Sequence, residues 1–131
     1  MFESMGIREL ATRAGVAPHT LRYYEDAGLM IPVERDSARR RLYTEAHLKW
    51  VRFLLNLRES GMRIAQIREY VRLVQSDSPS DQQRRLAMLS QHRDEVEVRI
   101  NRLTKHLAVI ERKVATGCEP ETRERAENNG D

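Results

Sequence analysis

The residues best suited to chemistry in this sequence are arginines, which supply 20 of its 23 basic side chains. Arg39, Arg40 and Arg41 are consecutive, and Arg35 precedes them by four positions. Adjacent guanidinium groups repel one another unless an anion lies near them, and their planar forks of donors suit phosphate groups and guanine. This cluster indicates either an anion-binding segment or a solvated, charged loop.

A second set of polar side chains lies on a predicted helix over residues 18–27. If Leu21 points inward, the period of about 3.6 residues per turn directs its neighbours to outward or flanking faces. A helix of this kind can enter the major groove of DNA, where side chains meet base edges. The neighbours in question are His19, Thr20, Arg22 and Tyr23. Beside such a helix, phosphate binding is the better explanation of the arginine cluster.

The elements that must position these side chains follow from local signals. Residues 7–14 form a predicted helix, Gly15 supplies the positive φ of a tight turn, and Pro18 favours the first position of a new helix. With the small Ala11 where the helices touch and Leu21 as an anchor, the spacing is typical of a helix-turn-helix. The sequence further predicts a hairpin over residues 35–43 and helices over residues 45–60 and 64–74.

The C-terminal half predicts a polar linker at 76–81 and one long helix at 82–116. Apolar residues recur there at alternating steps of three and four, a heptad seam about four repeats long. The seam consists of Leu86, Leu89, Val96, Ile100, Leu103, Leu107, Ile110 and Val114, with Arg93 at its one polar position. A helix of this length cannot bury the stripe alone. Either it folds back on the N-terminal domain, or two chains pair as a homodimeric coiled coil.

Composition excludes several classes of protein. The single cysteine, Cys118, rules out a disulfide or a multi-cysteine metal site within one chain. No apolar run reaches the roughly 18 residues of a membrane span, and the first residues lack a leader pattern, so we expect a cytoplasmic protein. No catalytic triad or glycine-rich phosphate loop is visible, and Trp50 and Phe53 have a packing explanation. We therefore expect neither an enzyme nor a cofactor.

Specific strings in this sequence resemble the mercury-resistance-regulator-like (MerR) transcription factors. The matching strings are Ile7-Arg8-Glu9-Leu10-Ala11, Gly15-Val16, Thr20-Leu21-Arg22-Tyr23-Tyr24-Glu25, Gly28-Leu29, Arg41-Leu42-Tyr43, Gly61 and Ile67. The resemblance covers most of the chain and implies a mostly α-helical fold. It implies a winged helix-turn-helix DNA-binding domain with a second helix pair over residues 1–75, the linker, and a dimerisation helix at 82–116 that forms an antiparallel coiled coil. Residues 117–131 form a predicted disordered tail.

Roles carry over from this resemblance by position. Thr20, Arg22 and Tyr23 match residues at the groove and the DNA backbone, and His19 matches a variable base-facing position. The family's wing, which corresponds to the hairpin, contacts phosphates through residues that match Arg35, Arg41 and Tyr43, to which we add Arg39 and Arg40. This sequence departs from the pattern where Arg39-Arg40 replace the usual Gly-Tyr and where Ala17 and Arg63 replace the usual serine caps.

The resemblance implies a homodimer that binds an inverted repeat in promoter DNA. Relatives distort that DNA so that RNA polymerase can use it, although a repressor that blocks polymerase is equally compatible with these residues. Relatives also sense signals beyond the dimerisation helix, where Cys118 is a possible effector-sensing thiol, an unreactive thiol, or part of an intersubunit site with His92 or His106. The alternative function is a coiled-coil adaptor whose basic head binds an acidic protein partner.

Overall fold

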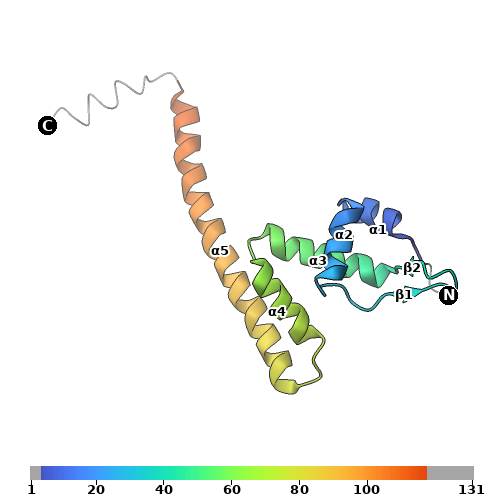
Figure 1. Cartoon of the computed structure of the whole chain (residues 1–131). Helices are drawn as coiled ribbons and strands as arrows, with labels where there is room; N and C mark the ends of the chain where they lie inside the picture. Colours follow the sequence, from blue (N-terminus) through green and yellow to red (C-terminus); the bar gives the residue numbers. More distant parts are fainter. Residues whose placement is uncertain (1–3, 118–131) are drawn as a thin grey trace. The chain divides into compact units, whose positions relative to one another are not determined.

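The computed structural model of the 131-residue chain describes residues 4–117. The chain divides into two units, Met1–His92 and Arg93–Asp131. The described residues form five helices and one small two-stranded sheet, which are labelled in Figure 1. The elements are α1 (Ile7–Ala14), α2 (Pro18–Asp26), β1 (Glu34–Arg35), β2 (Arg41–Leu42), α3 (Glu45–Glu59), α4 (Ile64–Val74) and α5 (Pro79–Thr116). The prediction of a mostly α-helical fold is confirmed.

The helix-turn-helix forms as the sequence predicts. Gly15 ends α1 with φ 75°, and its N–H donates to the carbonyl of Thr12. No atom would obstruct a Cβ at this glycine, so its requirement comes from the backbone angle alone. Pro18 begins α2, and Leu21 from that helix is fully buried with Ala11 from α1. The short turn therefore fixes α2 against α1 with its polar face outward.

The hairpin, which we call the wing, spans residues 34–43. Its strands pair antiparallel, with Arg35 opposite Arg41. Beyond β2, Met5 and Tyr43 exchange two main-chain hydrogen bonds of 2.7 and 2.9 Å, so the segment before α1 joins the base of the wing. These bonds place the wing beside the start of α1.

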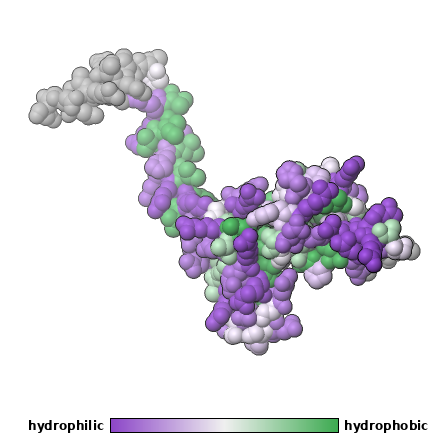
Figure 2. Space-filling model, viewed as in Figure 1, coloured by the Kyte–Doolittle hydropathy of each residue, from purple (hydrophilic) through white to green (hydrophobic). Residues whose placement is uncertain are grey.

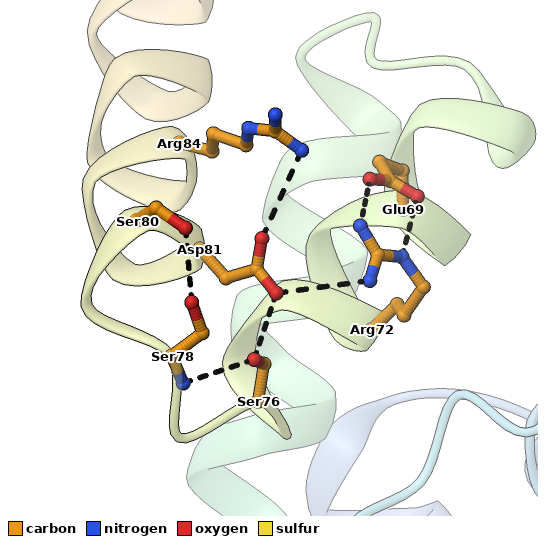
Figure 3. A network of polar contacts seen from close by, with 7 residues as sticks. All are labelled: Glu69, Arg72, Ser76, Ser78, Ser80, Asp81 and Arg84. Carbon is orange, nitrogen blue, oxygen red and sulfur yellow. Dashed lines mark hydrogen bonds and ion pairs between the residues drawn. The ribbon is translucent and has the colours of Figure 1, made fainter.

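The first turns of α5 belong to the N-terminal unit. The helix begins at Pro79, three residues earlier than predicted, because proline suits the first helical position and the carbonyl of Ser78 already accepts the Gln82 N–H. Asp81 accepts a hydrogen bond of 2.8 Å from Ser76, and Arg72 of α4 lies 3.9 Å from its carboxylate (Figure 3). This network links the end of α4 to the start of α5.

Further along α5, Leu89 packs against the core, and buried His92 lies 2.8 Å from the hydroxyl of Ser60 at the end of α3. The alternative that the helix folds back therefore holds for these first turns. The assignment of Leu89 to the dimerisation seam stays a prediction, and the partly buried side chain of Leu89 contacts the core of its own chain. Leu86 is 58% exposed.

The second unit consists, among the described residues, of α5 beyond His92. Its apolar side chains are mostly exposed, and Figure 2 shows them gathered along this part of the helix. The exposed seam residues are Ile100, Leu103, Leu107, Ile110 and Val114, and Val96 is half-buried. Between them lies a largely apolar hollow of about 420 Å³. This stripe has no covering element within residues 93–117.

Candidate nucleic-acid interface

Helix α2 presents the predicted polar face to solvent. His19, Arg22 and Tyr23 are exposed, and Thr20 is half-buried. The opposite face buries Leu21 completely. The structure therefore brings all four predicted groove-facing residues of this helix to the surface.

The turn of the wing is organised by one carboxylate. Asp36 accepts hydrogen bonds from the N–H groups of Arg40 (2.8 Å) and Ala38 (2.9 Å), and from Nε of Arg40 at 3.1 Å. The pKa of Asp36 is lowered, chiefly by the hydrogen bond from the N–H of Arg40. Desolvation opposes this effect in part, whereas the N–H of Ala38 and the charge of Arg40 lower the pKa further. The charged carboxylate thus fixes the turn.

Arg39 occupies the left-handed region, with φ 63°, and it is the one described residue other than glycine to do so. Its N–H donates to the carbonyl of Asp36, and the N–H of Asp36 donates to the carbonyl of Arg40, each at 2.9 Å. This pattern is a type I turn followed by a left-handed residue, which usually is glycine. The departure from the family's Gly-Tyr therefore leaves the turn intact but places an arginine at a glycine-like position.

Two residues assigned to phosphate contact lie behind the wing. Tyr43 is fully buried, and its hydroxyl donates to Oε1 of Glu25 at 3.3 Å. Burial, reinforced by the charge of Glu25, raises the pKa of Tyr43 to about 12. Arg41 is half-buried and forms an ion pair with the same carboxylate. Tyr43 cannot meet DNA from this position, so the expectation of a contact there is not supported.

A cleft opens between the wing, the start of α1 and helix α2. Its volume is about 710 Å³. We call it the arginine cleft, and its lining residues are Gly6, Ile7, Arg8, Arg22, Arg35, Arg39, Arg40 and Arg41. Among these arginines, only Arg40 and Arg41 have a carboxylate partner within residues 4–117. The cleft is therefore strongly cationic and suited to a phosphate backbone.

Arg8 had no signal of its own in the sequence, because nothing local relates the first turn of α1 to the wing. A second hollow, of about 580 Å³, lies along the other side of α2, where His19, Thr20 and Tyr23 meet Arg58 and a floor that includes Met62. Arg58 was not predicted either. Both arginines reach the interface through tertiary packing.

No group of three or more potential metal ligands occurs within residues 4–117. His92 is buried against Ser60, whereas His106 lines the apolar hollow of α5. Cys118 and nearly all of the predicted tail, residues 118–131, lie outside the described residues. In the described part of the chain, no helix is both long and apolar enough to cross a membrane.

The comparisons with known proteins agree with this geometry. The family described as "MerR HTH family regulatory protein" matches residues 5–73, and the family described as "MerR, DNA binding" matches residues 48–115. The HTH-type transcriptional regulator YyaN of Bacillus subtilis (strain 168) is 31% identical over 121 residues, which cover 84% of this chain and 88% of that protein.

Two solved structures are similar over nearly the whole chain. One is a MerR family transcriptional regulator from Listeria monocytogenes, with a TM-score of 0.79, 25% identity, and coverage of 97% of this chain and 96% of that chain. The other is HiNmlR, a MerR family regulator lacking the sensor domain, bound to promoter DNA, with a TM-score of 0.77, 25% identity, and coverage of 98% and 96%. These relatives are regulators, not enzymes. The chain therefore belongs to the MerR family of helix-turn-helix regulatory proteins.

Proposed function

We propose that the chain acts as a homodimer that binds an inverted repeat in promoter DNA and controls transcription there. The observation that carries the proposal is the arginine cleft, because six guanidinium groups converge beside the exposed face of α2. An acidic protein partner would use these charges but would leave the face formed by His19, Arg22 and Tyr23 without a role. Promoter DNA gives a role both to the arginine cleft and to the exposed face of α2.

The proposed contacts divide into base readers and phosphate contacts. His19, Thr20, Arg22 and Tyr23 face the major groove, where Arg22 supplies a bidentate fork for guanine. The phosphate contacts come from the arginine cleft, namely Arg8, Arg35, Arg39 and Arg40. Arg41 forms an ion pair with Glu25 and lines the cleft, so it contributes to the positive electrostatic potential there and does not bind a phosphate directly. Tyr43 positions Glu25 and is left out of the contact set.

The proposed dimer interface is the exposed stripe of α5 beyond His92. A helix with one apolar stripe buries it only against another surface, and a second copy supplies an identical one. Antiparallel pairing, which the family resemblance implies, covers Val96, Ile100, Leu103, Leu107, Ile110 and Val114. The domain scheme becomes a DNA-binding unit that includes the first turns of α5, followed by a dimerisation segment.

We further propose that the dimer distorts its promoter and that RNA polymerase is the partner at that site. HiNmlR, which is described as bound to promoter DNA, supports promoter binding by similarity, and distortion of the bound DNA is the proposed next step. Two recognition helices on one dimer contact successive major-groove faces, and bending a duplex to fit them costs about 1–6 kcal/mol, depending on sequence. The proposed location is the cytoplasm, where the chromosome of a bacterium lies.

The test is a binding series with three arginine variants on a duplex from upstream of the protein's own gene and on a random duplex. Arg22→Ala is expected to weaken specific binding at least tenfold and random binding less than threefold, since it removes a base contact. Arg40→Ala is expected to weaken both and to reduce the salt slope by about two units per dimer, one phosphate per protomer.

Arg102→Ala is the matched control, because it removes an exposed arginine on α5, far along the sequence from the cleft. It is expected to leave both affinities unchanged. Equal losses on both duplexes for Arg22→Ala would contradict base reading by α2, and an unchanged salt slope for Arg40→Ala would contradict a phosphate contact from the wing.

A further inference from the structure

The apolar stripe of α5 beyond His92 reads the same in both directions. From residue 96 to residue 114 the steps are four, three, four, three and four, and the residue types are Val, Ile, Leu, Leu, Ile and Val. Residues of one type are therefore equidistant from residue 105, namely Val96 and Val114, Ile100 and Ile110, and Leu103 and Leu107. An antiparallel second copy centred on residue 105 packs every side chain of the stripe against one of the same type.

The apolar hollow of α5 has the same centre. It has a volume of about 420 Å³, and its lining residues are Ile100, Leu103, Thr104, His106, Leu107 and Ile110. Each of these residues has a counterpart in the lining at the same distance on the other side of residue 105. The two-fold axis of the proposed dimer therefore crosses the helix pair at this hollow.

The two polar residues of the hollow lie on opposite flanks of the stripe. A rotation of about 100° per residue places Thr104 on one flank and His106 on the other. A two-fold axis that relates two antiparallel helices maps each flank onto itself. The two copies of His106 therefore face each other near the axis on one side of the helix pair, and the two copies of Thr104 face each other on the other side.

Within two turns of His106, the charged side chains on its flank are all positive. Arg102 precedes it by one turn, and Arg99 and Lys113 lie two turns away in either direction. The acidic residues Glu97 and Glu111 lie on the opposite flank, with Thr104. The second copy contributes the same set of side chains, so a proton gained by either imidazole meets like charge from both helices.

We propose that the facing copies of His106 make dimerisation sensitive to pH, so that the dimer weakens when both imidazoles are protonated. Histidine is the side chain that ordinarily changes charge between about pH 5 and pH 8. Because like charges repel across the axis, proton uptake is less favourable in the dimer than in separate chains, and dimer stability is lost as the pH falls through this range. The inference rests on the proposed homodimer and adds acidification as a condition that weakens it.

The first test measures the dimer Kd of the full chain by analytical ultracentrifugation at pH 7.5 and pH 5.5, at one ionic strength and without DNA. Acidification is expected to raise the wild-type Kd about fivefold, the effect of one facing pair of like charges near a protein surface. His106→Gln cannot gain a proton there and is expected to keep one Kd at both pH values. His19→Gln is the matched control, because this exposed histidine lies on α2, and it is expected to keep the wild-type response.

The second test examines the facing geometry with a short bismaleimide cross-linker in a Cys118→Ser background. His106→Cys is expected to give a covalent dimer, because its two copies face each other near the axis. Arg99→Cys is the matched control on the same flank, and its two copies lie about 18 Å apart along the helix axis at 1.5 Å per residue. The short linker is expected to leave this variant uncoupled.

Three results would overturn the inference. They are a wild-type dimer with the same Kd at both pH values, a His106→Gln variant that keeps the wild-type response, and an Arg99→Cys variant that couples as readily as His106→Cys. The last result is expected for parallel pairing, in which equivalent residues lie at the same level. A wild-type chain that is monomeric at both pH values would instead refute the proposed homodimer, and the inference with it.

Discussion

The buried hydroxyl of Tyr43 gives the fold a pH dependence that can be calculated. Its pKa is about 12 in the folded chain against 10.0 ordinarily, so between these values the folded state keeps a proton that the unfolded state has lost. The free energy of unfolding contributed by Tyr43 is complete below pH 10 and falls as the pH rises towards 12. The loss is about 1.4 kcal/mol between pH 8 and pH 11, and about 2.7 kcal/mol once both states are ionised.

Tyr43→Phe removes this titration together with the hydrogen bond to Glu25. At pH 8 the variant is expected to be less stable than the wild type by about 1 kcal/mol, the net value of such a bond. By pH 11 the variant is expected to be the more stable of the two by about 0.4 kcal/mol, since the wild type alone loses about 1.4 kcal/mol. The burial of Tyr70 also raises the pKa of that residue, but its contribution is common to both proteins and cancels in the difference.

The measurement is urea unfolding of both proteins at pH 8, 9, 10 and 11, at one protein concentration because dimerisation would add to the apparent stability. Tyr23→Phe, at a side chain that is 50% exposed, is the control and should follow the wild type throughout. A difference between wild type and Tyr43→Phe that stays constant from pH 8 to pH 11 would refute the reasoning, because it would mean that Tyr43 titrates alike in both states.

Two further predictions concern α5. Leu103→Glu is expected to convert the dimer into a monomer in analytical ultracentrifugation, because it puts a charge on the exposed stripe. Val109→Glu is the control, because Val109 is exposed but off the seam, and it should leave the dimer intact. A dimeric Leu103→Glu variant would count against the seam. His92→Ala is expected to lower the free energy of unfolding by about 1–2 kcal/mol, since it removes a buried ring and its hydrogen bond to Ser60. His106→Ala, at an exposed residue further along α5, should lower it by less than about 0.5 kcal/mol. Equal losses of stability in the two variants would argue against the His92 contact.

The sequence predicted the elements whose signals are local. The turn around Gly15, the proline that begins α2 and the apolar stripes of the helices each depend on neighbours within a few residues, and the structure confirms them. The start of α5 was placed too late because residues 79–81 read as polar linker. Proline and short polar side chains also suit a helix N-terminus, and tertiary contacts of Asp81 decide in favour of the helix.

The candidate interface was predicted only in part, for a different reason. Alternate residues of extended chain share a face, so Arg41 in β2 and Tyr43 just after it both contact Glu25, while Arg40 just before β2 is exposed. The sequence predicted phosphate contacts from all three residues, whereas the alternation of the extended chain puts Arg40 on the opposite side from Arg41 and Tyr43. Arg8 and Arg58 join the interface through contacts between segments distant in sequence, and no local pattern encodes such contacts.

The lack of a local signal for long-range contacts also explains why the sequence allowed two interpretations of α5, a helix folded back on its own domain and a coiled coil. A heptad pattern records which side chains lie on one face of a helix, but not which surface covers them. In this chain the covering surface changes near His92, because Leu89 packs on the core of its own unit whereas the seam residues from Ile100 to Val114 are exposed. Arg93, the one polar residue of the seam, comes directly after His92. An arginine is least costly where one packing surface ends and the next begins, because its charge can stay in water there.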